Sequence, residues 1–176
     1  MSLEHLPGIL STERLVLRPR EPGDAGIMRQ LWSERDERVP PHRRLDDDGR
    51  PTVEELAARI RADASSSGLL AVERKGIGDV IGYCGITASD DAPPNEPELA
   101  FELLRAVHGH GYATEAAAAV VAWARDAGYR RLRAGVWDWN AASRRVLTKL
   151  GFRETGSVGP GSVHRQSLMT IRDLEA

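Results

Sequence analysis

Two glycines and an alanine occupy alternate positions in the segment Gly109-His110-Gly111-Tyr112-Ala113. Small residues remove the side chains that would keep a ligand away from the backbone. The segment leads into an alanine-rich stretch at 115–127, so its N–H groups coincide with the positive end of a helix. Such donors bind phosphate or pyrophosphate. The spacing therefore predicts an anion site, although a strand-to-helix turn also needs glycine for steric reasons alone.

This turn differs from the two common nucleotide-binding loops. Thr114 stands where the dinucleotide fingerprint Gly-x-Gly-x-x-Gly requires its last glycine. No Gly-Lys-Ser/Thr sequence follows Gly109, as a P-loop would require. Both motifs are therefore excluded.

A second segment with chemical potential begins at Asn140. Asn140 is a suitable N-cap for a helix that ends before Gly151, and Ser143 lies on the first turn of that helix. A hydroxyl at this position can meet a ligand at the edge of a sheet. Taken alone, the segment is typical of an ordinary capped helix.

The histidines and the cysteine do not form a metal-site pattern. His108 and His110 are spaced as a pair, but no other histidine lies near them in the sequence, and we interpret them as turn residues. Cys84, the only cysteine, lies in the apolar run 80–86 and is predicted to be buried in the core. A single cysteine also excludes an internal disulfide and is typical of a reducing compartment.

The periodicity of apolar residues predicts the elements that position these segments. Thr52 and Glu55 have the spacing of a capping box and predict a helix start. A first helix is expected after Pro22, and further helices over 115–127 and 141–150. Strands are expected at 14–19, 69–72, 80–86, 98–104, 132–137, 152–158 and 163–171.

This order predicts a mixed α/β domain with helices on both faces of one sheet of about seven strands. The early strands should pair antiparallel, with a hairpin between 69–72 and 80–86. The helix at 115–127 should connect two parallel neighbours, which are the fourth and fifth strands. At 176 residues, the chain is expected to form a single domain, 1–176.

The charge and hydropathy of the chain exclude several classes of partner. A net charge of -2 produces no global field that would attract nucleic acid or an anionic membrane. No apolar run approaches the roughly 18 residues of a membrane span, and the first residues lack the pattern of a secretory signal. We therefore expect a soluble, cytoplasmic protein.

Together, the two segments resemble the signatures of the GCN5-related N-acetyltransferases (GNAT). His108-Gly109-His110-Gly111-Tyr112-Ala113 is similar to the acetyl-CoA motif Arg/Gln-x-x-Gly-x-Gly/Ala, and Asn140-x-x-Ser143 through Phe152 is similar to the second signature. The segments 12–18 and 98–101 further resemble the RimJ/RimL-like branch, which acetylates ribosomal-protein N-termini and includes enzymes acting on small amines and antibiotics. Two positions depart from the pattern, His108 from the usual arginine or glutamine and Ala100 from a frequent glycine.

The resemblance implies a mostly antiparallel sheet that is splayed between its fourth and fifth strands, with acetyl-CoA in the gap. The backbone of Leu103, Leu104 and Arg105 would pair with the pantetheine arm, and Asn140 and Ser143 would contact that arm near its sulfur. Arg144, or alternatively Arg145, would reach the nucleotide phosphates. The pyrophosphate would lie on the amides of His110, Gly111, Tyr112, Ala113 and Thr114.

Acyl transfer from a thioester to an amine needs a polarised carbonyl, a neutral amine and a proton for the thiolate. A backbone N–H near Leu103 is the expected donor to the carbonyl oxygen. Glu98 is the leading candidate for the base, with Glu102 and a water relay as alternatives. Ser143 is favoured as the proton donor to the thiolate, ahead of Tyr112.

The expected activity is thus direct transfer of an acetyl group from acetyl-CoA to a primary amine, with no metal. The acceptor is a protein N-terminus or a small molecule such as a polyamine, an amino acid or an aminoglycoside, and the assembly could be a homodimer. Two alternatives stay open: a non-catalytic acyl-CoA-binding sensor, and a structural domain whose glycines serve only turns.

Overall fold

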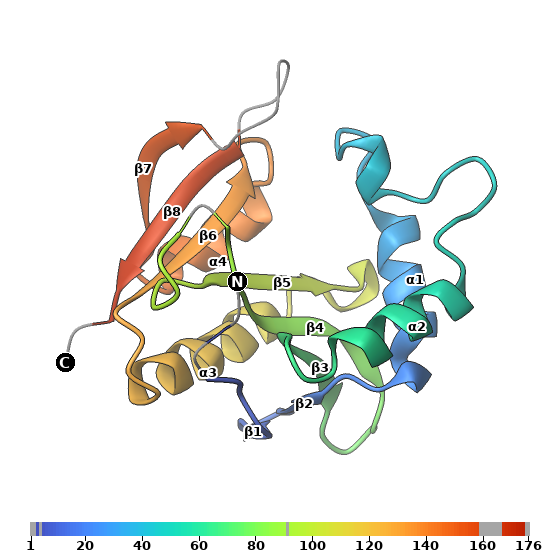
Figure 1. The fold of residues 1–176 in the computed structure, drawn as a ribbon, viewed down its shortest axis with the longest axis horizontal. Coiled ribbons are helices and arrows are strands. Elements are labelled where there is room, and N and C mark those ends of the chain that lie inside the picture. Colours follow the sequence, from blue (N-terminus) through green and yellow to red (C-terminus); the bar gives the residue numbers. More distant parts are fainter. Residues whose placement is uncertain (1–2, 4, 91, 159–166, 175–176) are drawn as a thin grey trace.

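The computed structural model describes residues 3, 5–90, 92–158 and 167–174. Its centre is one eight-stranded sheet in the order β1-β2-β3-β4-β5-β6-β8-β7 (Figure 1). All neighbouring strands pair antiparallel except β5 and β6, which are parallel. The strands are β1 (Leu10–Ser11), β2 (Leu15–Pro19), β3 (Gly68–Arg74), β4 (Val80–Thr87), β5 (Glu98–Leu103), β6 (Arg131–Trp137), β7 (Arg153–Val158) and β8 (Ser167–Asp173).

The predicted mixed, mostly antiparallel sheet is confirmed, with one strand more than expected. The additional strand, β1, has only two residues, too few for an alternating pattern to be recognised in the sequence. The last predicted strand, 163–171, is shifted: β8 begins at Ser167, and positions 163–166 lie outside the described residues. β8 also lies between β6 and β7. The chain therefore forms β7 at the edge of the sheet first, and β8 then fills the position between β7 and β6.

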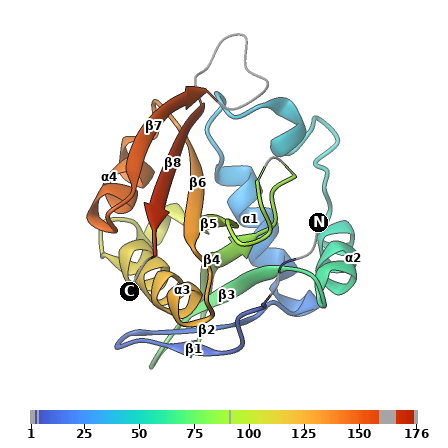
Figure 2. The ribbon, with the colours of Figure 1, turned by 60° about the vertical axis from the view of Figure 1, so that its left-hand side comes forward.

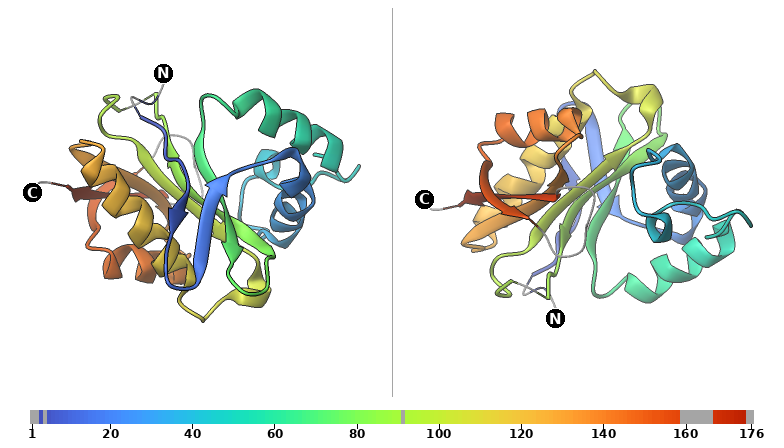
Figure 3. Two further views of the ribbon diagram at one scale, coloured as in Figure 1. Left: turned by 90° about the horizontal axis from the view of Figure 1, so that it is seen from below. Right: turned by 90° about the horizontal axis from the view of Figure 1, so that it is seen from above.

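Helices cover both faces of the sheet, as predicted (Figure 3). Helices α1 (Ala25–Glu34) and α2 (Val53–Asp63) lie on one face, and α3 (Tyr112–Asp126) and α4 (Ala141–Lys149) lie on the other. The start of α2 is the predicted capping box, since the Thr52 hydroxyl accepts from Glu55 N and the Glu55 carboxylate accepts from Thr52 N. Three short 3-10 helices, at 22–24, 41–43 and 105–107, join the elements.

Two hydrophobic clusters fix these layers. The larger lies between the sheet and α3, where the alanine-rich composition lets Ala116, Ala117 and Ala124 pack with no exposed surface. The smaller joins α1 and α2 through residues such as Met28, Leu31 and Ile60. Helix α3 is seen almost end-on beneath the strands in Figure 2, close to β2 and β4. The core therefore holds α3, and the turn before it, firmly against the sheet.

The sheet opens between β5 and β6, which are the fourth and fifth predicted strands. These strands are paired only at Glu98 and Arg133, near the beginning of β5, and then diverge (Figure 1). On their other sides, β5 follows β4 and β6 follows β8 over their full lengths. The predicted splay is therefore confirmed, and the open end lies at Leu103 and Trp137.

Candidate active site

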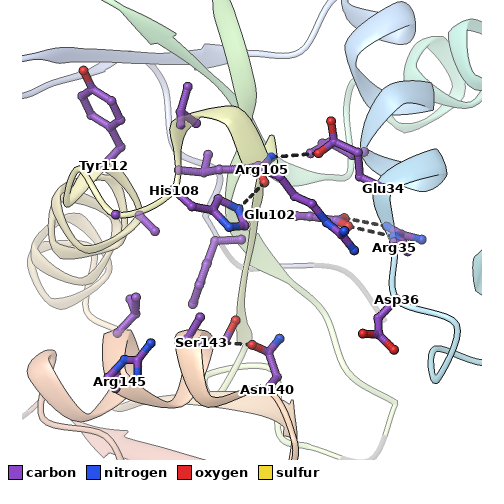
Figure 4. A pocket seen from close by; sticks show the side chains of 18 of the residues that line it. Glu34, Arg35, Asp36, Glu102, Arg105, His108, Tyr112, Asn140, Ser143 and Arg145 are labelled. Carbon is purple, nitrogen blue, oxygen red and sulfur yellow. Dashed lines mark hydrogen bonds and ion pairs between the residues drawn. The ribbon is translucent and has the colours of Figure 1, made fainter.

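A cavity of about 520 Å³ occupies the open end of the sheet. One end is formed by the turn before α3, which contributes Gly109, Gly111, Ala113 and Thr114. The other end is formed by the end of α1 and the loop after it (Figure 4). The first turns of α4 lie along one wall and the end of β5 along another.

The turn before α3 offers a continuous run of backbone donors. Gly109 and Gly111 have φ angles of 78° and 81°, a region that glycine adopts without steric cost. The first amide used inside the helix is that of Glu115, which donates to Gly111 O at 3.0 Å. Across the described residues, the amides at 109–114 have no hydrogen-bond partner. This turn therefore has free backbone donors of the kind that bind phosphate groups at the start of a helix.

The side chains of the same turn contact groups of the turn itself and Arg14. His110 folds back, and its Nδ1 donates to His108 O at 2.9 Å. The Tyr112 ring stacks on His110 at 5.9 Å between centroids, and the Arg14 guanidinium lies 4.4 Å from its centre. In Figure 4, this ring points away from Ser143, a position that does not suit Tyr112 as a proton donor to a thiolate. Only its backbone remains directed to the site.

Asn140 and Ser143 face the cavity from the beginning of α4. The Asn140 Oδ1 accepts from Ser143 N at 3.1 Å, the N-cap interaction that the sequence predicts. Both residues line the cavity opposite His108 (Figure 4). The Ser143 hydroxyl forms no hydrogen bond within the described parts of the chain, so it can donate to a ligand.

Of the three backbone positions expected to meet the pantetheine arm, only Leu103 keeps a donor directed to the gap. Leu104 N donates to Ile81 O at 2.9 Å, and Arg105 N donates to Glu34 Oε2 at 2.8 Å. In an antiparallel pair, alternate residues direct their N–H and C=O groups away from the partner strand. The bond of Leu104 to β4 means that Leu103 is such a residue. Its N–H therefore points to the side from which β6 has diverged.

The Leu103 carbonyl is held by His108, whose Nε2 donates to it at 2.8 Å. In the neutral ring, this leaves Nδ1 as a proton acceptor. The His108 side chain lies in the cavity between the end of β5 and Ser143 (Figure 4). From the sequence, His108 is interpreted as a turn residue and as a departure from the acetyl-CoA motif, because the path of the turn that directs its ring inward has no local signature.

Glu98 and Arg144 lie outside the cavity lining, and their expected roles stay predictions. Glu98 lies at the paired end of β5 and does not line the cavity, whereas Glu102 does. Arg144 Nε donates to Glu154 Oε1 at 2.9 Å, and its Nη1 donates to Asp138 O at 3.0 Å. Arg145, the alternative to Arg144, lines the cavity and forms no ion pair within the described part of the chain. Lys149, one turn later, does the same.

The end of the cavity near α1 contains Arg35 and Tyr83, which the sequence does not identify as site residues, beside Glu102, the alternative candidate for the base. Arg35 forms two hydrogen bonds to Glu102, at 2.8 and 2.6 Å, and Tyr83 OH donates to Glu102 Oε2 at 3.1 Å. Burial and the charge of Glu102 raise the pKa of Tyr83, so its phenol remains a donor. Trp139 lines the same region, with the Arg38 guanidinium 4.1 Å from its ring centre.

Of the remaining candidates, Cys84 lies in the core and His110 in the turn before α3. Cys84 is fully buried, as predicted, and burial raises the pKa of its thiol. His108 and His110 direct their rings to different carbonyl groups. Among the residues that the structure describes, no cluster of histidine, cysteine and acidic side chains could hold a metal ion. None of the described helices is both long enough and apolar enough to cross a membrane.

Comparison with known proteins gives a consistent result. Residues 14–153 match the model of the acetyltransferase (GNAT) domain. An uncharacterized N-acetyltransferase of Bacillus subtilis is 35% identical over 81 residues, which are 46% of this chain and 52% of that protein. The chain thus spans about half the length of this curated relative.

Two solved structures illustrate the shared fold. A GNAT-family acetyltransferase from Bacillus anthracis superposes with a TM-score of 0.81 at 20% identity, covering 96% of this chain and 99% of that chain. A putative acetyltransferase from Salmonella typhimurium was solved with its cofactor acetyl-CoA. It superposes with a TM-score of 0.70 at 20% identity, covering 92% of this chain and 94% of that chain.

Proposed function

Since the chain belongs to the acetyltransferase (GNAT) domain family, we propose that it transfers the acetyl group of acetyl-CoA directly to a primary amine. The observation that carries this proposal is the run of unpartnered amides at 109–114, located beside the gap between β5 and β6. The related Salmonella protein was solved with acetyl-CoA, which supports this choice of donor.

The pyrophosphate of acetyl-CoA lies on the amides from His110 to Thr114 in this proposal. Arg145 and Lys149 supply positive charge for the phosphates from α4, in place of Arg144. The pantetheine arm enters the gap, where it meets the Leu103 backbone on one side. Asn140 and Ser143 contact it from the other side.

Three groups of the chain divide the chemistry among them. The Leu103 N–H polarises the thioester carbonyl and stabilises negative charge as it develops on the oxygen. His108 Nδ1 accepts the proton that the amine loses as its nitrogen bonds to the acetyl carbon. The Ser143 hydroxyl donates a proton to the sulfur as the carbon–sulfur bond breaks. Glu102, which is bonded to Arg35 and Tyr83, stabilises the wall at the end of the cavity near α1, where the acceptor binds in this proposal. This region is called the acceptor end.

We assign the chain to the RimJ/RimL-like branch and treat residues 1–176 as a single domain. The branch assignment rests on segments 12–18 and 98–101. The first of these is held at the start of α3, because Thr12 Oγ1 donates to Glu115 Oε1 at 2.6 Å. The proposal includes a cytoplasmic location, which rests on the single, buried cysteine.

Mass spectrometry of a mixed amine library, incubated with the protein and acetyl-CoA, tests this function. The expected result is at least one product that is heavier by an acetyl group, together with release of free CoA thiol. Calorimetric titration with acetyl-CoA provides the second measurement. Binding without any acetylated product would instead favour the acyl-CoA sensor, and absence of binding would favour a purely structural domain.

A further inference from the structure

We propose that the acceptor amine carries a carboxylate close to its nitrogen, and that the guanidinium groups of Arg43 and Arg105 hold this carboxylate. The inference rests on the proposed function, since it names the acceptor class of the same site. It begins from the charges that line the end of the cavity near α1, away from the phosphate turn (Figure 4).

Three carboxylates line this end, and each is already engaged. Glu102 is neutralised by the two-point contact with Arg35. Asp36 accepts from Arg38 Nε and Nη2 at 2.8 and 2.9 Å.

Glu34 is the third carboxylate, and its partners are neutral. Its Oε2 accepts from Arg105 N at 2.8 Å, and its Oε1 accepts from Gln30 Nε2 at 3.1 Å. These bonds occupy both oxygens of Glu34 but do not neutralise its negative charge, because both donors are uncharged.

Two guanidinium groups at this end have no such engagement. Arg43 and Arg105 both line the cavity, and neither side chain forms a hydrogen bond or ion pair with the residues that the structure describes. The Arg43 backbone is held in place, because Arg35 Nη1 donates to Arg43 O at 2.6 Å. The Arg105 side chain extends from the end of β5 toward Arg35 and Asp36 (Figure 4).

Electrostatic effects on neighbouring groups agree with these positions. Hydrogen bonds from Arg38 lower the pKa of Asp36 well below its usual range, and the charge of Arg105 adds to this effect. The charge of Arg43 opposes the rise in the pKa of Tyr83 that burial causes. Both arginines therefore act on the same end of the cavity.

The side chains that line this end carry three positive and three negative charges, so it is distinguished by unpaired groups and not by a net charge. The pairs Arg35–Glu102 and Arg38–Asp36 each sum to zero, which leaves Glu34 against the two guanidiniums of Arg43 and Arg105. Two unpaired guanidiniums in this wall disfavour polyamines and aminoglycosides, because these acceptors carry several positive charges. A guanidinium without a partner is instead suited to a carboxylate, which it can bind through two parallel hydrogen bonds.

The carboxylate must lie near the reacting nitrogen. Arg105 follows Leu103 by two positions, and Leu103 provides the N–H assigned to the thioester carbonyl. A free amino acid satisfies this requirement through its α-carboxylate, and a peptide satisfies it when its first residue is aspartate or glutamate. Both sources present the same chemistry.

Matched acceptors separate these sources and test the inference. One pair compares an L-amino acid with its carboxamide, and a second compares peptide amides that begin with Glu or with Gln. Spermidine serves as the cationic acceptor. Initial rates of CoA thiol release should give a kcat/KM at least about tenfold higher for the carboxylate member of one pair, as a charge-assisted hydrogen bond predicts. Equal values in both pairs, or preference for spermidine, would overturn the inference and leave the acetyltransferase function standing.

In the double variant Arg43→Gln/Arg105→Gln, the ratio of kcat/KM for the carboxylate acceptor to kcat/KM for its matched neutral acceptor should fall to near one. Arg125→Gln is the matched control, because Arg125 lies on α3, does not line the cavity and should leave the ratio unchanged. Equilibrium binding of the N-acetylated amino acid and the N-acetylated peptide to the CoA-bound protein gives a readout that needs no turnover. If CoA binds but no acceptor reacts, the proposed function fails. If neither acetylated product binds more weakly to the double variant, the inference fails.

Discussion

Arg35 and Glu102 are 67 positions apart in the sequence and meet in a two-point ion pair, with Nε–Oε1 and Nη2–Oε2 distances of 2.8 and 2.6 Å. The pair joins the residue that ends α1 to strand β5 beside the open end of the sheet. Since Arg35 also donates to Arg43 O, one side chain connects three segments of the acceptor end. This contact therefore shapes the acceptor end of the cavity, and membership of the family does not specify which acceptor binds there.

The substitution Glu102→Gln should destabilise the protein, because it leaves the charge of Arg35 without its counterion. The two side chains are only 11% and 24% exposed, so we expect a loss of about 2 kcal/mol in the free energy of unfolding. Urea unfolding measures this loss. Glu154→Gln breaks the more exposed pair with Arg144 and should change stability by less than about 0.5 kcal/mol. Equal losses in the two variants would contradict the importance of burial.

Replacing Gly109 with alanine should weaken acetyl-CoA binding beyond its effect on stability. Gly109 and Gly128 have φ angles of 78° and 90°, and an added Cβ would meet no atom within 4 Å at either position. Both alanine variants should therefore lose about 1 kcal/mol of stability through backbone strain. Only Gly109 lies in the turn assigned to the pyrophosphate, so calorimetry should show weaker binding for Gly109→Ala alone. Similar affinities in the two variants would remove the turn from the binding site.

Ser143→Ala should slow the chemical step more than it weakens acetyl-CoA binding. Loss of a positioned proton donor typically costs about 100-fold or more in rate. Single-turnover measurements give the chemical step, and calorimetry gives the affinity. Thr148→Ala is the control on the same helix, since its hydroxyl donates to Arg144 O instead of the cavity. A pure loss of affinity would limit Ser143 to a binding role.

His108→Gln should lower turnover at neutral pH by roughly 100-fold, because glutamine cannot accept the amine proton. The loss should shrink at higher pH, where hydroxide can accept this proton in place of His108. Glu98→Gln tests the role that the sequence favours, and it should retain turnover because Glu98 does not line the cavity. A pH–rate profile for each variant provides the comparison. A severe defect in Glu98→Gln alone would restore the carboxylate mechanism.

Acid should weaken the attachment of the N-terminal strands to α3. Burial opposes ionisation of Glu115, but hydrogen bonds from Thr12 and Arg14 outweigh burial and hold the pKa of this carboxyl below its ordinary 4.5. A depressed pKa in the folded state contributes stability above pH 4.5, and this stability is lost as the pH falls through the folded value. Glu115→Gln should therefore be less stable than the native chain at pH 7. The difference in the free energy of unfolding between the two, measured by urea unfolding, should narrow below pH 4.5. A difference independent of pH would show that the ionised form makes no contribution.

Local rules were sufficient where a feature depends on neighbouring residues. The Thr52–Glu55 capping box, the N-cap at Asn140 and the positive end of α3 all arise within four positions of the chain, and each forms as predicted. Burial of Cys84 followed from its apolar surroundings. The positions of Arg144 and Glu98 outside the cavity lining depend on contacts beyond their own elements.

The sequence by itself determined the element order, the mixed sheet and the glycine-rich turn, because periodicity and glycine chemistry act over short distances. The split of the sheet was implied by the resemblance to the GNAT signatures. Only the tertiary structure showed that Arg145 and not Arg144 lines the cavity, since adjacent helix positions differ by about 100° in direction and packing selects which one faces it. It also showed that Glu102 and not Glu98 lines the cavity, although the two share a strand face and lie about 13 Å apart. Which of them reaches the cavity depends on where β6 leaves β5, and the pairing of strands distant in sequence sets that point.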